Sequence, residues 1–307
     1  MSDPIGTYTF LPWIRRGIAN KIAASTKLRA SIDVRIDIEA TKKGGGALPP
    51  VQVPRKVELY GPGDIVGIER AQISRVEPRH WVTNFEPNYL AAIEFYDEDF
   101  PWRYTPAAPN GKRLLPWIAL VVLKEGKEFT EGGNVAGKPL SYIDVTGDLA
   151  AVFPNASELW AWAHAHFNAD LSDKVVEPDG AKAAQAAQQV IDHAPDTACS
   201  RLLCPRKLEP KTAYHAFLIP AFESGRLAGL GRDPKPFFDD AANALTPTSS
   251  SWAPYANRPD ATSFPFYHRW YFRTAEDGDF ESLVRLLKPK IVDSRVVLTG
   301  ISQGGFG

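Results

Sequence analysis

Two histidines separated by one residue have the types and spacing to bind a metal. His164 and His166 end the stretch Trp-Ala-Trp-Ala-His-Ala-His that begins at Trp160. On a strand, alternate side chains point to one side, so both imidazoles could bind one ion, whereas on a helix they would point roughly 160° apart. Candidate oxygen ligands follow at Asn168, Asp170 and Asp173. The pattern therefore indicates a metal site whose third ligand is unidentified, and the alternative is a pair of hydrogen-bonded histidines beside packed tryptophans.

A second group of chemically capable residues mixes carboxylates with aromatic rings between Glu94 and Tyr104. Paired carboxylates can hydrolyse a glycoside, and Trp102 or Tyr104 could stack on a sugar ring. This pattern predicts a carbohydrate-binding site at Trp102 and Tyr104. The alternative is a strand end followed by an acidic, solvated turn that Arg103 partly neutralises.

Near the end of the sequence, an apolar run leads into Gly-Ile-Ser-Gln-Gly, with the serine at Ser302. This segment resembles the nucleophile elbow of the α/β-hydrolase family, in which the serine lies on a tight turn between a strand and a helix. The resemblance implies a catalytic serine, but that family supplies its histidine and acid after the serine, whereas all six histidines here precede it. A hydrolase would need another order of residues, such as Ser302 with His268 and an aspartate. The alternative is a glycine-rich tail or a truncated boundary.

The composition argues against several classes of protein, among them nucleic-acid-binding and membrane-spanning proteins. The 307 residues include 35 Lys and Arg against 36 Asp and Glu, a formal charge of -1, which gives no overall field for nucleic acid or an anionic membrane. The longest apolar run, 114–123, contains Pro116 and is far shorter than the roughly 20 residues that cross a bilayer. Two cysteines, spaced C-x4-C, are too few for a disulfide framework or a zinc site. We therefore expect a cytoplasmic protein with no cofactor, no membrane span and no nucleic-acid partner.

The clearest periodicity lies in residues 28–40, where apolar and polar side chains alternate over thirteen positions. A period of two predicts a strand with one buried and one charged face. Residues 51–60 read as a returning strand interrupted by Pro54, after a Gly-rich tip. Such a long hairpin could cover its own core, or it could extend and pair with a neighbouring chain by strand addition.

Turn signals punctuate the rest of the chain, which contains 26 prolines. Apolar runs predict strands at 72–76, 90–96, 115–123, 212–222 and 264–273, with 115–123 buried on both faces. Helices are predicted at 12–22, 155–163, 179–193 and from Asp279 onward. The expected fold is α+β, with a β-rich mixed sheet, a long N-terminal hairpin and several short helices in the second half. The expected division is a β-rich part over 1–125 and a mixed part over 140–307, with one continuous domain as the alternative.

Several further segments are similar to a group of large, uncharacterised bacterial proteins associated with gene clusters for phage-tail-like contractile injection particles. The resemblance covers about residues 8 to 292 and is carried by 9–17 (Thr-Phe-Leu-Pro-Trp-Ile-Arg-Arg-Gly), 58–64, 84–90, 95–104 and 159–164. It implies a structural or assembly role and supplies no catalytic residues.

Together these observations predict a non-enzymatic structural or assembly protein that binds other protein chains, with self-association through residues 28–60. The alternatives are a hydrolase, acting through Ser302 or through a metal at His164 and His166, and a carbohydrate-binding module.

Overall fold

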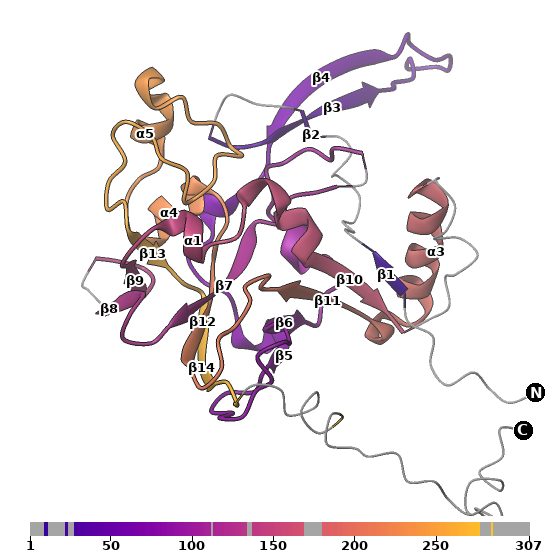
Figure 1. The fold of residues 1–307 in the computed structure, drawn as a ribbon. Helices are drawn as coiled ribbons and strands as arrows, with labels where there is room; N and C mark the ends of the chain where they lie inside the picture. The colour runs from indigo at the N-terminus through magenta and orange to yellow at the C-terminus, as the bar shows by residue number, and fades with distance from the viewer. Residues whose placement is uncertain are drawn as a thin grey trace, which may run out of the picture.

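The structure is a computed structural model (Figure 1), and it describes residues 9–11, 22–23, 28–111, 113–133, 137–168, 180–276 and 284. Within these ranges the chain forms one five-stranded and three three-stranded β-sheets, together with short helices. The predicted α+β, β-rich class is confirmed. None of the helices in these ranges has the length and apolar character needed to cross a membrane.

The largest sheet is antiparallel and draws on strands from both halves of the chain. In spatial order its strands are β1 (Thr9–Leu11), β10 (Ala163–Phe167), β11 (Ala198–Leu203), β6 (Ala92–Phe95) and β5 (Ile73–Glu77). The central pairing aligns Ile93 with Leu202. Burial alternates along β11, where every second residue is buried, because one face of this sheet covers the core.

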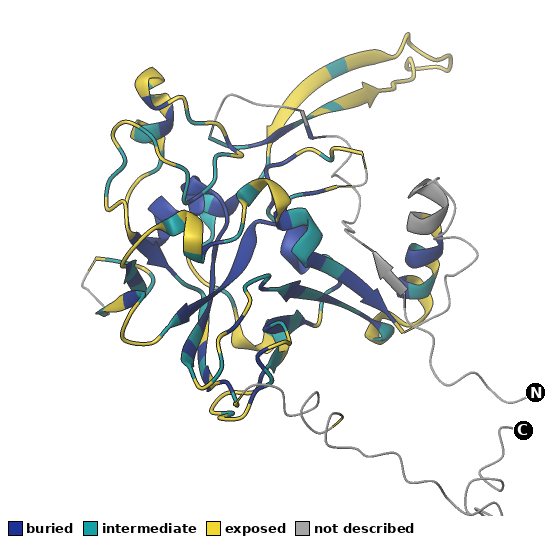
Figure 2. Cartoon of the chain, viewed as in Figure 1, coloured by how far each residue is buried: buried dark blue, intermediate teal, exposed yellow. Residues whose placement is uncertain are grey.

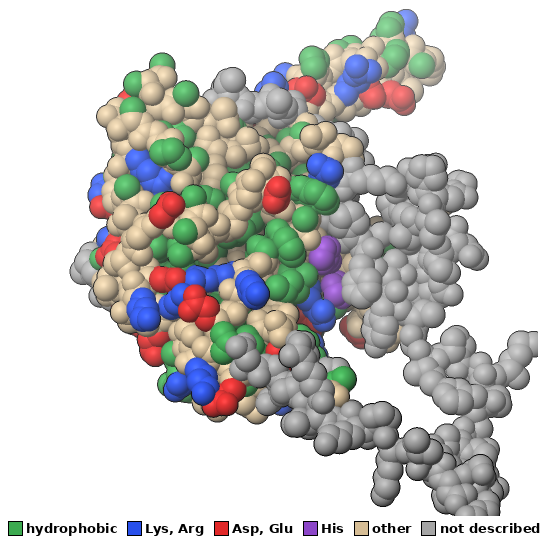
Figure 3. Space-filling view, in the orientation of Figure 1, with side chains coloured by type: hydrophobic (Ala, Val, Ile, Leu, Met, Phe, Trp, Pro, Cys, Tyr) green, Lys and Arg blue, Asp and Glu red, His purple; other side chains and the backbone are tan. Residues whose placement is uncertain are grey.

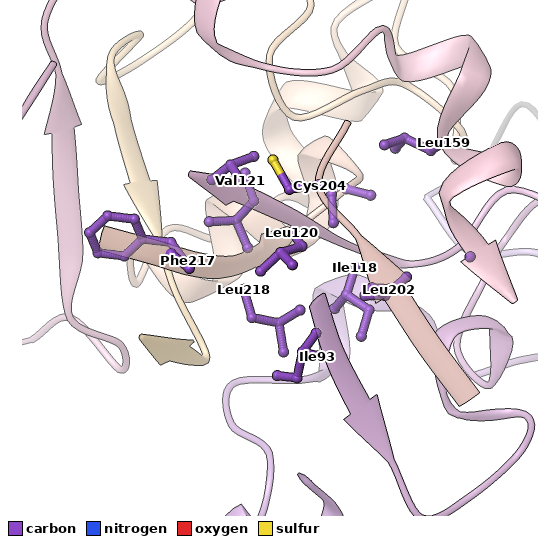
Figure 4. Packing of buried hydrophobic residues seen from close by; sticks show 14 of the residues in the cluster. Ile93, Ile118, Leu120, Val121, Leu159, Leu202, Cys204, Phe217 and Leu218 are labelled. Carbon is purple, nitrogen blue, oxygen red and sulfur yellow. The ribbon is translucent and has the colours of Figure 1, made fainter. Parts of the chain in front are cut away.

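A second sheet lies at the centre of the molecule, and a third packs on it. The second contains β14 (His268–Arg273), β12 (Ala213–Pro220) and β7 (Ile118–Lys124), and the third contains β13 (Ser263–Pro265), β9 (Tyr142–Val145) and β8 (Phe129–Gly133). Phe129 packs edge-on against Phe217, with ring centroids 5.0 Å apart. The other face of the second sheet presents Leu120 and Leu218 toward Ile93 (Figure 4). Layers on both sides explain why β7 is apolar nearly throughout, and the prediction of burial on both faces is confirmed.

The core is one continuous cluster that contains residues of both predicted parts, 1–125 and 140–307. Strand β6 pairs with β11, and β7 pairs with β12, so neither part forms a sheet layer of its own at the centre. The fourth sheet stands apart from this core. It contains β2 (Ile22–Ala23), β3 (Ser31–Ile38) and β4 (Val51–Glu58), and β3 and β4 project from the body as an arm (Figure 1).

The described helices occupy connections, and all but one of them have seven residues or fewer. The α-helices are α1 (Leu149–Val152), α3 (Gly180–His193), α4 (Glu223–Gly229) and α5 (Lys235–Asp239). The 3₁₀ helices are η2 (Pro62–Asp64), η3 (Arg70–Gln72), η4 (Phe100–Trp102), η5 (Ala156–Trp162), η6 (Pro195–Thr197) and η7 (Ala241–Asn243).

Several predicted elements differ in kind or length from those observed. The thirteen-residue strand is the eight-residue β3, because the chain bends at residues 28–29 before the pairing begins. The helix predicted at 155–163 is the 3₁₀ helix η5, and Asn155 caps it by accepting a hydrogen bond from the Ser157 backbone amide. The strand predicted at 264–273 divides into β13 and β14, which belong to different sheets. The helix predicted from Asp279 onward and nearly all of the one predicted at 12–22 lie outside the described residues.

Candidate functional site

His164 and His166 lie on β10, the strand geometry that a shared metal requires. Their ring centroids are 6.1 Å apart, with the ring planes tilted by 44°. In the sheet register His164 lies opposite Arg201 of β11, and His166 lies opposite Cys199. The described ranges contain no group of three His, Cys, Asp or Glu side chains that could hold a metal ion.

The surroundings of the two histidines favour neutral imidazoles. Burial lowers the pKa of His166 to about 4, and the nearby charge of Arg201 acts in the same direction. Burial also lowers the pKa of His164. At neutral pH the pair is therefore an uncharged part of a sheet face. Two neutral imidazoles that could bind a metal therefore lie on one strand. The part of the chain that the structure describes provides no third ligand beside them.

Trp102 is not available to a sugar. Its side chain is fully buried, and its indole N–H donates a hydrogen bond to the Leu114 carbonyl over 3.2 Å. The sugar-stacking role predicted for Trp102 is therefore wrong, because no ring face reaches solvent. Tyr104 is half-buried and packs edge-on against Trp117, with centroids 5.1 Å apart. Apart from Tyr96, which is exposed, the aromatic residues of this segment belong to the core or pack against it.

The carboxylates of the same segment line a surface cavity of about 610 Å³. Asp97 and Asp99 both bind the Arg103 guanidinium, at 2.8 and 2.5 Å. Asp196 and Cys199 contribute from a segment about 100 residues further along, which sequence spacing could not reveal. The shared arginine partly neutralises the two aspartates, as expected of an acidic, solvated turn.

The serine-hydrolase prediction depends on a residue outside the described ranges. Ser302 lies beyond residue 284, the last that the structure describes. The proposed base, His268, lies on β14, and burial lowers its pKa to about 4. The proposed pairing of Ser302 with His268 therefore stays a prediction.

The most distinctive feature among the described residues is the projecting arm formed by β3 and β4. The strands pair over eight positions, from Ser31 opposite Glu58 to Ile38 opposite Val51. Beyond Ile38, Thr41 and Ala47 form a further bridge, and the Lys42 amide donates to the Gly46 carbonyl over 2.9 Å. The three glycines at 44–46 all have positive φ, a conformation that favours glycine. The tip sequence thus closes the hairpin.

The base of the arm is fixed to the body. The Arg29 guanidinium binds the Asp64 carboxylate, and the Asp64 carboxylate also accepts a hydrogen bond of 2.9 Å from the Gly61 amide. Next to this ion pair, Ala30 is buried, and its carbonyl accepts a hydrogen bond from the Leu59 amide over 2.9 Å. These contacts hold both strands where they leave the core.

The two faces of the arm differ sharply in character. The register places isoleucine and valine side chains together on one face: Ile32 beside Val57, Ile36 beside Val53, and Ile38 beside Val51, with Val34 beside Arg55. The opposite face carries mainly charged and polar side chains, such as Asp33 opposite Lys56. The arm is therefore an amphipathic two-stranded ribbon.

The apolar face of the arm is open to solvent. The exposed fractions are 46% for Ile36, 50% for Ile38, 56% for Val51 and 43% for Val57. Figure 2 shows exposed residues along both strands, and Figure 3 shows hydrophobic and charged side chains together on the arm. Two-stranded hairpins are marginally stable alone and are stabilised when a hydrophobic face packs on another element. Contiguous exposed apolar side chains mark interaction surfaces.

Comparison with known proteins adds no relative: no family model, curated protein or solved structure matches the chain significantly. The alternation over residues 28–40 was the sequence signal for the arm. The predicted burial of one face is wrong for the outer half of β3, where Ile36 and Ile38 are exposed. No sequence signal indicated this exposure, because the same alternation also describes a strand that covers its own core.

Proposed function

We propose that this chain is a non-enzymatic structural or assembly protein, and that the β3–β4 arm joins it to other protein chains. The observation that carries this proposal is the exposed apolar face of a ribbon whose base is anchored by the Arg29–Asp64 ion pair. The sequence resemblance to proteins encoded with contractile particles supports the more specific proposal that this role lies in the assembly of a phage-tail-like particle in the cytoplasm.

Energetics support a contact role for the arm. Burying apolar surface contributes roughly 25 cal/mol per Å², so side chains such as Ile36 and Val51 would stabilise a complex that covers them. The polar face, with Asp33 and Lys56, would stay hydrated in that complex. An enzymatic role has weaker support, because Trp102 is buried and the His164–His166 pair has no third ligand within the described ranges.

The decisive experiment is sedimentation velocity on two proteins from micromolar to millimolar concentration. One is the full chain, and the other has residues 33–56 replaced by a two-residue turn, so that the Ile32–Val57 pair and the base are kept. We expect concentration-dependent association of the full chain that is lost in the shortened chain. A matched control replaces Gln52, on the polar face, with serine and should associate like the full chain.

Two results would overturn this proposal. One is a full chain that stays monomeric at every concentration. The other is equal association of the full and shortened chains, since the contact would then lie elsewhere. Circular dichroism of the shortened chain checks that its body is folded.

A further inference from the structure

The arm has two edges, and only one of them is suited to strand addition. Strand β4 contains Pro54, which has no N–H, and prolines in strands lie with that position toward a free edge. The outer edge of β4 therefore lacks a donor near its middle. On the other side, β2 pairs with β3 only at Ser31 and Ile32. In the part of the chain that the structure describes, the edge of β3 from Asp33 to Ile38 has no partner strand.

The directions of the backbone N–H and C=O groups also indicate that the edge of β3, and not the edge of β4, is suited to strand addition. If the nitrogen of Pro54 faces away from β3, Arg35 opposite it belongs to a pair that makes no hydrogen bonds within the arm. The N–H and C=O groups of Arg35, and of Asp33 and Asp37 two positions away, then point to the outer edge of β3. This edge presents alternating donors and acceptors to an incoming strand.

We propose that the incoming strand is β3 of a second copy of this chain, antiparallel to the first and related to it by a two-fold axis at Ile36; this inference rests on the proposed function. The axis is perpendicular to the ribbon, so both apolar faces lie on the same side of the joined sheet. The product is a four-stranded sheet in the order β4, β3, β3 and β4.

Charge complementarity identifies the second copy as the partner. Along the polar face of β3 the charges alternate as Asp33, Arg35 and Asp37. With the axis at Ile36, Arg35 of each chain faces Asp37 of the other, so two attractive pairs form by symmetry. The only like-charged neighbours are Asp33 and Glu39, and Glu39 lies beyond the last residue of β3.

Neighbouring registers are less favourable. An axis at Arg35 places that arginine against itself and Asp33 against Asp37. An axis at Asp37 places two aspartates together. An axis at Val34 restores charge pairing but requires the edge at Ile32, which β2 already occupies. A shift by a single residue in one chain alone would bring apolar positions opposite charged ones.

The apolar face also benefits from this register. Ile36 meets its symmetry mate, and Val34 meets Ile38 of the other chain. The apolar stripes of two arms become one wider apolar surface, which single arms do not present. Pairing of two edges also satisfies the backbone groups that each β3 leaves open.

A cysteine placed on the axis tests the register directly. Residue 36 would form a non-hydrogen-bonded antiparallel pair with itself, at a Cα separation of about 4.5 Å, which lies within the range for a disulfide. The experiment compares Ile36→Cys with Asp37→Cys, both in a Cys199→Ser background, and Cys204 is buried. Under mild oxidation we expect a disulfide-linked dimer for Ile36→Cys, and at least about tenfold less for Asp37→Cys, which faces residue 35 instead.

Exchanging the charges at Arg35 and Asp37 tests the same register independently, with self-association measured by sedimentation velocity. Arg35→Asp and Asp37→Arg should each weaken self-association at least about tenfold, because like charges then face each other twice. An equimolar mixture of the two variants should associate again as a heterodimer, and the double variant should recover association with itself. Recovery excludes misfolding as the cause of the loss.

The outcomes separate this inference from the proposed function. Association that requires the arm, with no Ile36→Cys dimer and no effect of the charge variants, would overturn the β3–β3 pairing and leave the proposed function standing. Association that survives arm shortening, or a monomeric full chain, would overturn both.

Discussion

Arg226 and Glu223 form a fully buried ion pair within α4. The Arg226 Nε and Nη2 atoms donate hydrogen bonds to the two Glu223 carboxylate oxygens, at 2.8 and 2.6 Å, and both side chains have zero exposed area. The Tyr255 hydroxyl donates to the same carboxylate over 2.6 Å. Arg226 also donates to the carbonyls of Pro259 and Ser263. The pair thus ties α4 to the connection that leads into β13.

We predict that Arg226→Met lowers the free energy of unfolding by about 3–5 kcal/mol, because it leaves the Glu223 carboxylate buried without its cation. Urea unfolding followed by tryptophan fluorescence measures this change. The double variant Glu223→Gln and Arg226→Met should lose less than the sum of the single variants, because no uncompensated charge is left in it. Additive losses would show that the two residues act independently.

The second stability prediction concerns Trp102, whose role is in the core and not in binding a sugar. The side chain is enclosed in the core, and Trp102→Ala should lower the free energy of unfolding by about 3–5 kcal/mol through lost contacts and a cavity. The matched control is Tyr96→Ala in the same segment, where the ring is 63% exposed, and it should change stability by less than about 0.5 kcal/mol. A Trp102→Ala protein as stable as the control would contradict the observed packing.

Local patterns predicted several of these elements correctly. The apolar run at 115–123 predicted a strand buried on both faces, and β7 is that strand. The alternation at 28–40 predicted the first strand of the hairpin, since a period of two is a local property of the strand itself. Pro54 was interpreted as an interruption, but β4 continues through it because a strand at a sheet edge tolerates a missing donor.

Long-range packing explains what the sequence could not provide. Mixed aromatic and acidic residues around Trp102 resemble a binding site, and only the tertiary structure shows that this ring faces the core. Glu223 and Arg226, three residues apart, have the spacing of an exposed helical ion pair. Their burial depends on the chain around Tyr255 and Ser263, more than 30 residues away.

The histidines on β10 give a pH prediction with a definite sign. The pKa of His166 is lowered from its ordinary value near 6.5 to about 4, mainly by burial and further by the charge of Arg201. Between these two pH values the unfolded chain binds a proton at this residue that the folded chain does not. The free energy of unfolding therefore falls as the pH is lowered from about 6.5 to about 4. His164, whose pKa burial also lowers, adds to the effect.

Replacing His166 with glutamine removes the proton that the unfolded chain, but not the folded chain, binds at this position between pH values of about 6.5 and about 4. Urea unfolding of the His166→Gln variant and the wild type, measured across this pH range, should show a shallower fall in stability for the variant, because glutamine does not ionise. The comparison uses the slopes of the two curves, so that any constant change in stability caused by the substitution cancels. Parallel curves would mean that His166 binds its proton equally well in the folded and unfolded chains, against the burial that the structure shows.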